Sequence, residues 1–186
     1  MENESGNSGN SGNRDIPGTD NLAEDVQEHA EQLARRLPFA GHAAWLMMRS
    51  QPHRLMFLQD LEWRVFPPLL LEQCKLYFDN KAGQLPVAFV SWAKLSDEAE
   101  RDYVASQRIA PGAWNSGEHL WLVDFVAPFG ATRTVLNDIH GGVLKGREVK
   151  LLYPGPDGKV GPVRLADLVT PPTVGPGDDD GRNRAH

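Results

Sequence analysis

The sequence predicts an α+β domain, in which a mainly antiparallel mixed sheet is flanked by helices. Apolar runs flank a turn-rich loop twice, at residues 74–95 and at residues 148–165, and each pattern is typical of a β-hairpin. Segments with helical spacing or helix-start residues lie before and between these hairpins. Helices and hairpins mixed along one chain in this way imply the α+β class.

The 186 residues are enough for one domain with a real core. Residues 1–22 are mostly Gly, Ser and Asn, and residues 171–186 are mostly Pro, Gly and charged residues. Neither composition can bury enough apolar surface to offset the entropy lost on ordering. We therefore predict a disordered acidic arm over residues 1–28, a single domain over residues 29–168 and a disordered tail over residues 169–186.

Helices are expected before the first hairpin. Residues 23–37 have helical propensity but only a thin apolar stripe, which predicts a marginal helix. Residues 40–50 form a short apolar helix that ends before a proline. Apolar spacing over residues 55–73 is consistent with a helix that Pro67 and Pro68 interrupt.

After the first hairpin, Ser96 is a predicted N-cap, and acidic residues follow it in the first turn of a helix. Seven of the nine residues that start at Leu120 are apolar or aromatic, which is typical of a strand buried on both faces. Asp124 lies in the middle of that strand. The next helix is expected to end at Gly141 and Gly142.

A buried carboxylate at Asp124 needs a partner, because an unpaired buried charge is costly. His53 follows Pro52 on an irregular corner between apolar segments. One hypothesis makes His53 a general base with Asp124 as its buried partner. The other makes His53 a satisfied structural residue, and residue type alone favours it. The spacing of the two residues does not establish contact.

Composition limits the possible functions. Residues 1–30 carry seven acids and one base, so residues 31–186 sum to zero formal charge. A neutral body argues against general nucleic-acid binding, which needs a basic face. The sequence has no Gly-rich phosphate loop of the common types and no Cys/His metal spacing, so we expect no bound cofactor and no metal.

Compartment and redox state are also constrained. Cys74 is the single cysteine, so a disulfide within the chain is impossible, and its place at the start of an apolar strand indicates a core residue rather than a nucleophile. The N-terminus lacks the features of a secretory signal, and the apolar runs are too short to span a bilayer. We therefore predict a cytoplasmic protein.

Three segments resemble signature segments of the toxin-activating lysine acyltransferases, the haemolysin-activating proteins that act on RTX protoxins. They are GHAAWLMMRSQPHR (41–54), PVAFVSWAKLS (86–96) and SGEHLWLVDFVAPFG (116–130). They occur in that family's order and close to its spacings. The resemblance covers roughly residues 41–153. The long polar arm, the glycines after the last helix and the C-terminal tail depart from the family's pattern.

The resemblance implies a fold like that of the Gcn5-type N-acyltransferases. It also implies transfer of a fatty acyl group from acyl carrier protein to the ε-amino group of internal lysines of an RTX protoxin. The family's essential histidine and aspartate fall on His53 and Asp124, and two of its serines fall on Ser50 and Ser91. Either serine could support the substrate or its oxyanion. A base is needed because lysine is almost wholly protonated at neutral pH.

Two rival functions are less consistent with the sequence. A non-catalytic partner or chaperone of a secreted repeat protein, on a degenerate acyltransferase fold, has no reason to bury a carboxylate. A coenzyme A-dependent N-acetyltransferase is disfavoured because the chain lacks a Gcn5-type pyrophosphate loop. A covalent acyl-enzyme, the acceptor and its lysines, the acyl length and the oligomeric state, including a homodimer, stay open.

A basic excess suggests where the donor docks. Residues 133–164 carry six bases against three acids, and acyl carrier proteins are strongly acidic. Candidate docking residues are Arg133, Lys145, Arg147 and Lys150. A solvated face with scattered Lys and Arg accounts for the same excess equally well.

Overall fold

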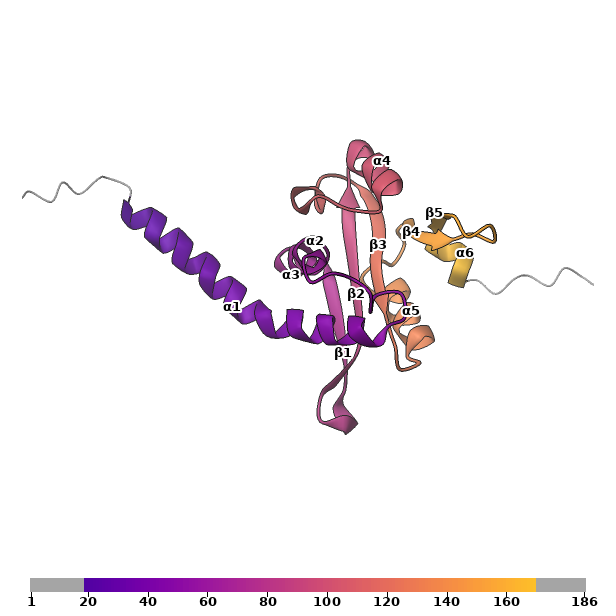
Figure 1. Ribbon diagram of the computed structural model, residues 1–186, viewed down its shortest axis with the longest axis horizontal. Coiled ribbons are helices and arrows are strands. Elements are labelled where there is room, and N and C mark those ends of the chain that lie inside the picture. Colours follow the sequence, from indigo (N-terminus) through magenta and orange to yellow (C-terminus); the bar gives the residue numbers. More distant parts are fainter. Residues whose placement is uncertain (1–18, 170–186) are drawn as a thin grey trace, which may run out of the picture.

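The computed structural model describes residues 19–169, and Figure 1 shows its helices and strands. The predicted arm over residues 1–28 and tail over residues 169–186 lie mostly outside the described residues, so the proposed domain limits stay predictions. The first helix, α1, begins at Thr19, within the segment assigned to the arm. No helix of the described part of the chain is long and apolar enough to cross a bilayer.

Helix α1 (Thr19–Arg49) is continuous over the two segments predicted as separate helices, residues 23–37 and 40–50. The prediction of a break between them was wrong. Pro38 lies inside α1. A proline removes one backbone donor and kinks a helix, and Figure 1 shows that α1 bends about midway. The helix survives because its second half is held by packing. That half buries Ala40, Ala43, Leu46 and Met47 at helical spacing.

Two short helices follow α1, and the paired prolines separate them as predicted. Helix α2 spans Asp60–Arg64, and helix α3 spans Phe66–Leu70. Pro67 and Pro68 occupy the start of α3. A proline is tolerated there because the first N–H groups of a helix have no partner within it.

The described residues form one five-stranded sheet in the order β1-β2-β3-β4-β5. Its strands are β1 (Cys74–Asp79), β2 (Leu85–Leu95), β3 (His119–Val126), β4 (Val149–Pro154) and β5 (Val160–Arg164). Both predicted hairpins are confirmed, and each pair is antiparallel. Strands β3 and β4 pair in parallel, which makes the sheet mixed.

The parallel pair is short. Leu120 to Leu122 of β3 pair with Val149 to Leu151 of β4, and the register goes no further. Strand β3 continues alongside β2 as far as Val126. The two parallel strands therefore separate in the second half of β3.

Helix α4 (Asp97–Ser106) begins as predicted, since Ser96 Oγ accepts a hydrogen bond from the N–H of Ala99 at 3.2 Å. Helix α5 (Thr132–Gly141) ends at the predicted glycines. The remaining elements were not predicted. They are the 3-10 helices η1 (Asn80–Ala82) and η2 (Pro111–Ala113) and helix α6 (Leu165–Val169).

Side-chain alternation along β2 divides the core between the two faces of the sheet. Ala88, Val90 and Trp92 pack with α5, through a cluster that includes its Ile139. Phe89 packs with α1 and α3 on the opposite face. On that same face, Ala93 and Leu95 lie in a third cluster with α2 and α4. The face that carries α1, α2 and α4 is called the helix-rich face below.

Candidate active site

Asp124 points to the helix-rich face because β3 contains a bulge. Ser91 of β2 pairs with Asp124, but the next residue, Trp92, pairs with Leu122, so Val123 is an extra residue. Leu122 packs in the α5 cluster, and simple alternation would send Asp124 to the same face. The extra residue reverses the alternation and re-aims the carboxylate, a common use of bulges beside active sites.

The Asp124 carboxylate is fully buried and has three side-chain partners. His53 Nε2 lies 3.1 Å from Oδ1. Arg64 Nε donates to Oδ1 at 2.8 Å and to Oδ2 at 3.0 Å. Ser91 Oγ, also buried, donates to Oδ2 at 3.5 Å. The two residues proposed from sequence are therefore in contact, while their catalytic role stays a prediction.

Arg64 is the partner that the sequence analysis missed. It comes from the last turn of α2, and its guanidinium lies 5.2 Å from the ring centroid of Trp63. Nothing in the local sequence distinguishes it from other surface arginines. The free-energy cost of burying the Asp124 carboxylate was an indication that it needs a cationic partner in addition to an imidazole.

The charge state of Asp124 follows from its neighbours. Burial alone would raise the pKa of the Asp124 carboxyl, but the positive charge of Arg64 and the hydrogen bond from His53 outweigh it. The pKa of Asp124 is therefore lowered, and the side chain is a carboxylate at neutral pH. Burial and the negative charge of Asp124 both raise the pKa of the Tyr103 hydroxyl on α4, so Tyr103 stays protonated.

An ionised Asp124 fixes the hydrogen-bonding pattern of His53. A carboxylate can only accept, so His53 Nε2 carries the proton that it donates to Asp124. In the neutral imidazole, Nδ1 is then the basic atom, and Ser50 Oγ lies 2.8 Å from it. A turn after α1 brings the pair together, because the backbone N–H of His53 donates to the carbonyl of Ser50 at 3.1 Å. The result is a relay from Ser50 through His53 to Asp124.

The two predicted serines therefore lie at opposite ends of the relay. Ser50 is half-buried beside Nδ1 of His53, where a substrate could meet it. Ser91 is buried and donates to Asp124, so it supports the carboxylate.

Cys74 packs against the cluster under α1, and burial raises the pKa of its thiol to about 11. A protonated, half-buried thiol agrees with the interpretation of Cys74 as a core residue.

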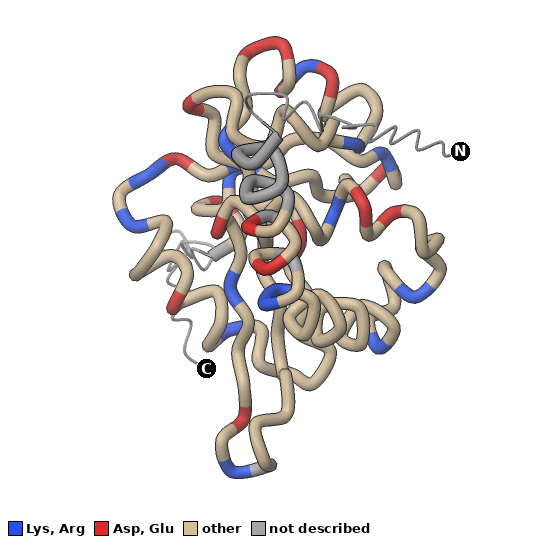
Figure 2. Tube along the Cα trace, turned by 90° about the vertical axis from the view of Figure 1, so that its left-hand side faces the viewer, with Lys and Arg blue, Asp and Glu red and all other residues tan. Residues whose placement is uncertain are grey.

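The four predicted docking residues do not form one patch. Arg133 lies on α5, and Lys145 and Arg147 are exposed in the turn that follows it. Lys150 lies on β4 and pairs with Glu100 of α4 at 2.8 Å, on the helix-rich side of the sheet. Figure 2 likewise shows basic and acidic residues interspersed along the trace.

No group of three or more His, Cys, Asp or Glu in the described residues could hold a metal ion.

Comparison with known proteins identifies the family. The model of the RTX toxin acyltransferase family (HlyC) matches residues 33–164. The chain belongs to this family. The resemblance drawn from the three sequence segments is confirmed.

Individual relatives agree with the family match. The leukotoxin-activating lysine-acyltransferase LktC of Pasteurella haemolytica-like sp. (strain 5943B) is 35% identical over 100 residues, covering 53% of this chain and 59% of the relative. The protein-lysine palmitoyltransferase CyaC of Bordetella bronchiseptica is 32% identical over 126 residues, covering 64% and 66%. The lysine-acyltransferase RtxC of Vibrio cholerae is 31% identical over 109 residues, covering 58% and 70%. The match to LktC thus spans less than two thirds of that relative's length.

Proposed function

We propose that this protein transfers a fatty acyl group from acyl carrier protein to the ε-amino group of internal lysines in an RTX protoxin-type acceptor. The observation that carries the proposal is the relay of Ser50, His53 and Asp124, held by Arg64, in a chain of the RTX toxin acyltransferase family. Relatives named as lysine acyltransferases and as a protein-lysine palmitoyltransferase support the reaction type.

The relay supplies the base that the reaction needs. A free lysine has a pKa near 10.4, so its amine is protonated at neutral pH and cannot attack. In the proposed reaction the lysine nitrogen forms a bond to the thioester carbonyl carbon, and the carbon–sulfur bond breaks. Because the lysine starts as an ammonium, its nitrogen loses two protons. His53 Nδ1 accepts one of them and returns it to the leaving thiolate, and the other is released to solvent. Asp124 stabilises the transient imidazolium, and Arg64 keeps Asp124 in place.

The position of Ser50 allows two routes. Ser50 is half-buried and its hydroxyl oxygen lies 2.8 Å from His53 Nδ1, so it could pass the lysine proton to the imidazole or itself attack the thioester. The second route leaves an acyl group on Ser50 and predicts a heavier enzyme after incubation with donor alone. The first route leaves the mass of the enzyme unchanged, so intact mass without acceptor distinguishes them.

The donor is proposed to be a carrier-protein thioester, and the Gcn5-type fold implied by the resemblance is part of the proposal. The chain lacks a pyrophosphate-binding glycine loop, which a phosphopantetheine arm does not require. The pairing of β3 with β4 ends at Leu122, two residues before Asp124. We place the arm of the donor at the point where this pairing ends, with its thioester directed toward His53.

Intact-mass analysis of a lysine-bearing acceptor tests the proposal. An RTX-type acceptor incubated with this protein should gain the mass of one acyl group per modified lysine with acyl carrier protein as donor and no mass with acyl-coenzyme A. His53→Ala should reduce transfer by about 10²-fold or more, since a positioned base contributes at least that much. His140→Ala, at an exposed histidine of α5, is the matched control and should retain full transfer. A stable complex with no mass gain would support the chaperone alternative and contradict catalysis.

A further inference from the structure

A groove on the helix-rich side of the sheet lies beside β3, the strand that carries Asp124, and none of its lining residues belongs to the relay. It has a volume of about 680 Å³ and is bounded by α4, β3, β4, β5 and α6. Its apolar walls are Val104, Ala105, Trp121, Pro162, Val163 and Leu168. This volume falls within the range of roughly 300–1,000 Å³ typical of sites that bury small ligands.

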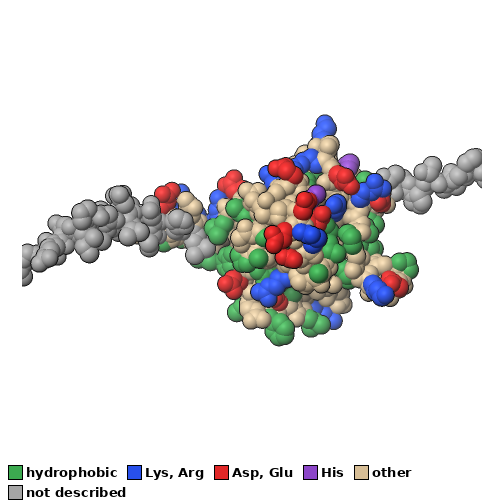
Figure 3. All heavy atoms as spheres, turned by 90° about the horizontal axis from the view of Figure 1, so that it is seen from above, with side chains coloured by type: hydrophobic (Ala, Val, Ile, Leu, Met, Phe, Trp, Pro, Cys, Tyr) green, Lys and Arg blue, Asp and Glu red, His purple; other side chains and the backbone are tan. Residues whose placement is uncertain are grey.

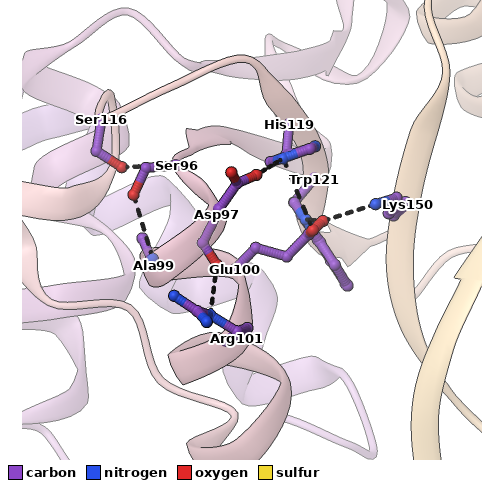
Figure 4. Close-up of polar contacts among 9 residues, drawn as sticks. All are labelled: Ser96, Asp97, Ala99, Glu100, Arg101, Ser116, His119, Trp121 and Lys150. Carbon is purple, nitrogen blue, oxygen red and sulfur yellow. Dashed lines mark hydrogen bonds and ion pairs between the residues drawn. The ribbon is translucent and has the colours of Figure 1, made fainter.

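Four of the five charged residues that line the groove form two ion pairs, and the fifth, Arg101, donates from Nε to the backbone carbonyl of Asp97 at 3.2 Å. Glu100 Oε1 accepts from Lys150 Nζ at 2.8 Å and from Trp121 Nε1 at 2.8 Å. Figure 4 shows Glu100 reaching from α4 toward both of these residues. At the other end, Arg164 donates to Asp167 at 3.0 Å. These pairs hold the rim while the walls between them stay apolar, so the groove suits a hydrocarbon better than an ion.

The groove begins close to the proposed reaction centre. Trp121 in its wall and Asp124 lie on the same face of β3, three residues apart. At the rise of a strand this separation is about 10 Å. Tyr103 packs edge-on against Trp121, with ring centroids 5.2 Å apart, and it is close enough to Asp124 for the negative charge of that carboxylate to act on its hydroxyl. A chain attached to a carbonyl at His53 would have to extend about 10 Å along β3, past the buried Tyr103, to reach the groove.

We infer that this groove binds the hydrocarbon chain of the fatty acyl donor, an inference that rests on the proposed function. The transferred group is apolar, so it needs an apolar surface that starts near the thioester carbon. Removing one methylene from water is worth about 0.8 kcal/mol, which corresponds to about fourfold in affinity. A groove of this kind makes donor affinity depend on chain length, while a site for the pantetheine arm alone does not.

Isothermal calorimetry with acyl-pantetheines of two to sixteen carbons tests the inference without an acceptor. Affinity should rise with each added methylene, by up to about fourfold for each one that is fully buried, until the groove is filled. Ala105→Trp fills an exposed position of the wall and should weaken palmitoyl-pantetheine at least tenfold while leaving acetyl-pantetheine unchanged. Ala34→Trp, exposed on α1, is the matched control and should bind both as the wild type does.

A second variant changes the opposite wall of the groove, so the test does not depend on α4 alone. Leu168→Glu places a carboxylate on the opposite wall, on α6, and should also weaken palmitoyl-pantetheine selectively. An affinity that does not vary with chain length, or both variants binding palmitoyl-pantetheine normally, would overturn the inference. Acyl transfer is measured separately. Transfer without chain-length dependence would refute the groove alone, and chain-length-dependent binding without transfer to any acceptor would refute the proposed function alone.

Discussion

At the scale of single residues, Asp124 organises the site. Its two carboxylate oxygens meet one imidazole, one guanidinium and one hydroxyl, so a buried charge is fully compensated. Such a charge is a poor source of net stability, because desolvation offsets most of the attraction. Its presence is better explained by the orientation that it imposes on His53, whose basic Nδ1 is thereby turned toward Ser50.

Removing Arg64 should destabilise the protein strongly. In Arg64→Ala the buried Asp124 carboxylate keeps only His53 and Ser91, and breaking a buried ion pair costs about 3 kcal/mol. Urea unfolding should therefore show a loss of about that size. Adding Asp124→Asn to Arg64→Ala should restore part of it, because the uncompensated charge is then gone. A loss in Arg64→Ala that is unchanged by the second substitution would contradict a charge-based role.

The lowered pKa of Asp124 predicts a dependence of stability on acid. Its folded pKa lies below the unfolded value of about 3.9, so the unfolded chain takes up the proton first as pH falls. The stabilisation is therefore complete above about pH 5 and is lost as pH falls from about 4 through the folded pKa. Denaturant titrations of wild type and Asp124→Asn should diverge above this window and converge below it. A constant difference between the two proteins at all pH values would refute the assignment.

At the scale of elements, the sequence predicted the features that depend on residues close together in the chain. The hairpins, the Ser96 cap and the end of α5 at Gly141 depend on residues within one or two turns of each other. Features set by contacts between distant segments were not predicted. Pro38 does not end α1, because the second half of the helix is held against the sheet.

The site was predictable to the same extent. Residue types and the family resemblance indicated His53 and Asp124. The bulge at Val123 that aims Asp124, and the meeting of Arg64 with it across 60 residues, depend on strand register and helix packing. Neither leaves a pattern in a single sequence, because a one-residue change of register reverses every later side chain.

The entry to β3 depends on a close backbone approach at Gly117. A Cβ at this position would lie 2.6 Å from the carbonyl oxygen of Leu95 and 2.6 Å from the backbone of Ser96. Gly117→Ala should therefore displace the start of β3 and destabilise the protein by about 1–3 kcal/mol. Gly112→Ala, where a Cβ meets nothing within 4 Å, is the matched control and should change the unfolding midpoint little. Equal unfolding midpoints for the two variants would show that the backbone at Gly117 can move to accommodate a Cβ without a loss of stability.

At the scale of the whole molecule, the distribution of charge over the described residues bears on where an acidic carrier protein could dock. Figure 3 shows acidic and basic side chains interspersed on the surface seen from above, and Lys150 is already paired with Glu100. Lys145 and Arg147, by contrast, are both exposed in the turn after α5. If an acidic carrier protein is steered by charge, these two residues are better placed to act on it than Lys150.

Reversing both exposed charges tests that idea. Steering acts mainly on the rate of association and is screened by salt, while the relay at His53 is untouched. The double variant Lys145→Glu, Arg147→Glu should therefore raise KM for acyl carrier protein at low salt, flatten its salt dependence and leave kcat nearly unchanged. A control with Arg35→Glu and Lys81→Glu reverses two exposed bases on other elements and should retain the wild-type salt dependence. Identical salt profiles for the two double variants would place the docking surface elsewhere. A fall in kcat in the first variant alone would instead mean that these residues help to position the thioester after docking.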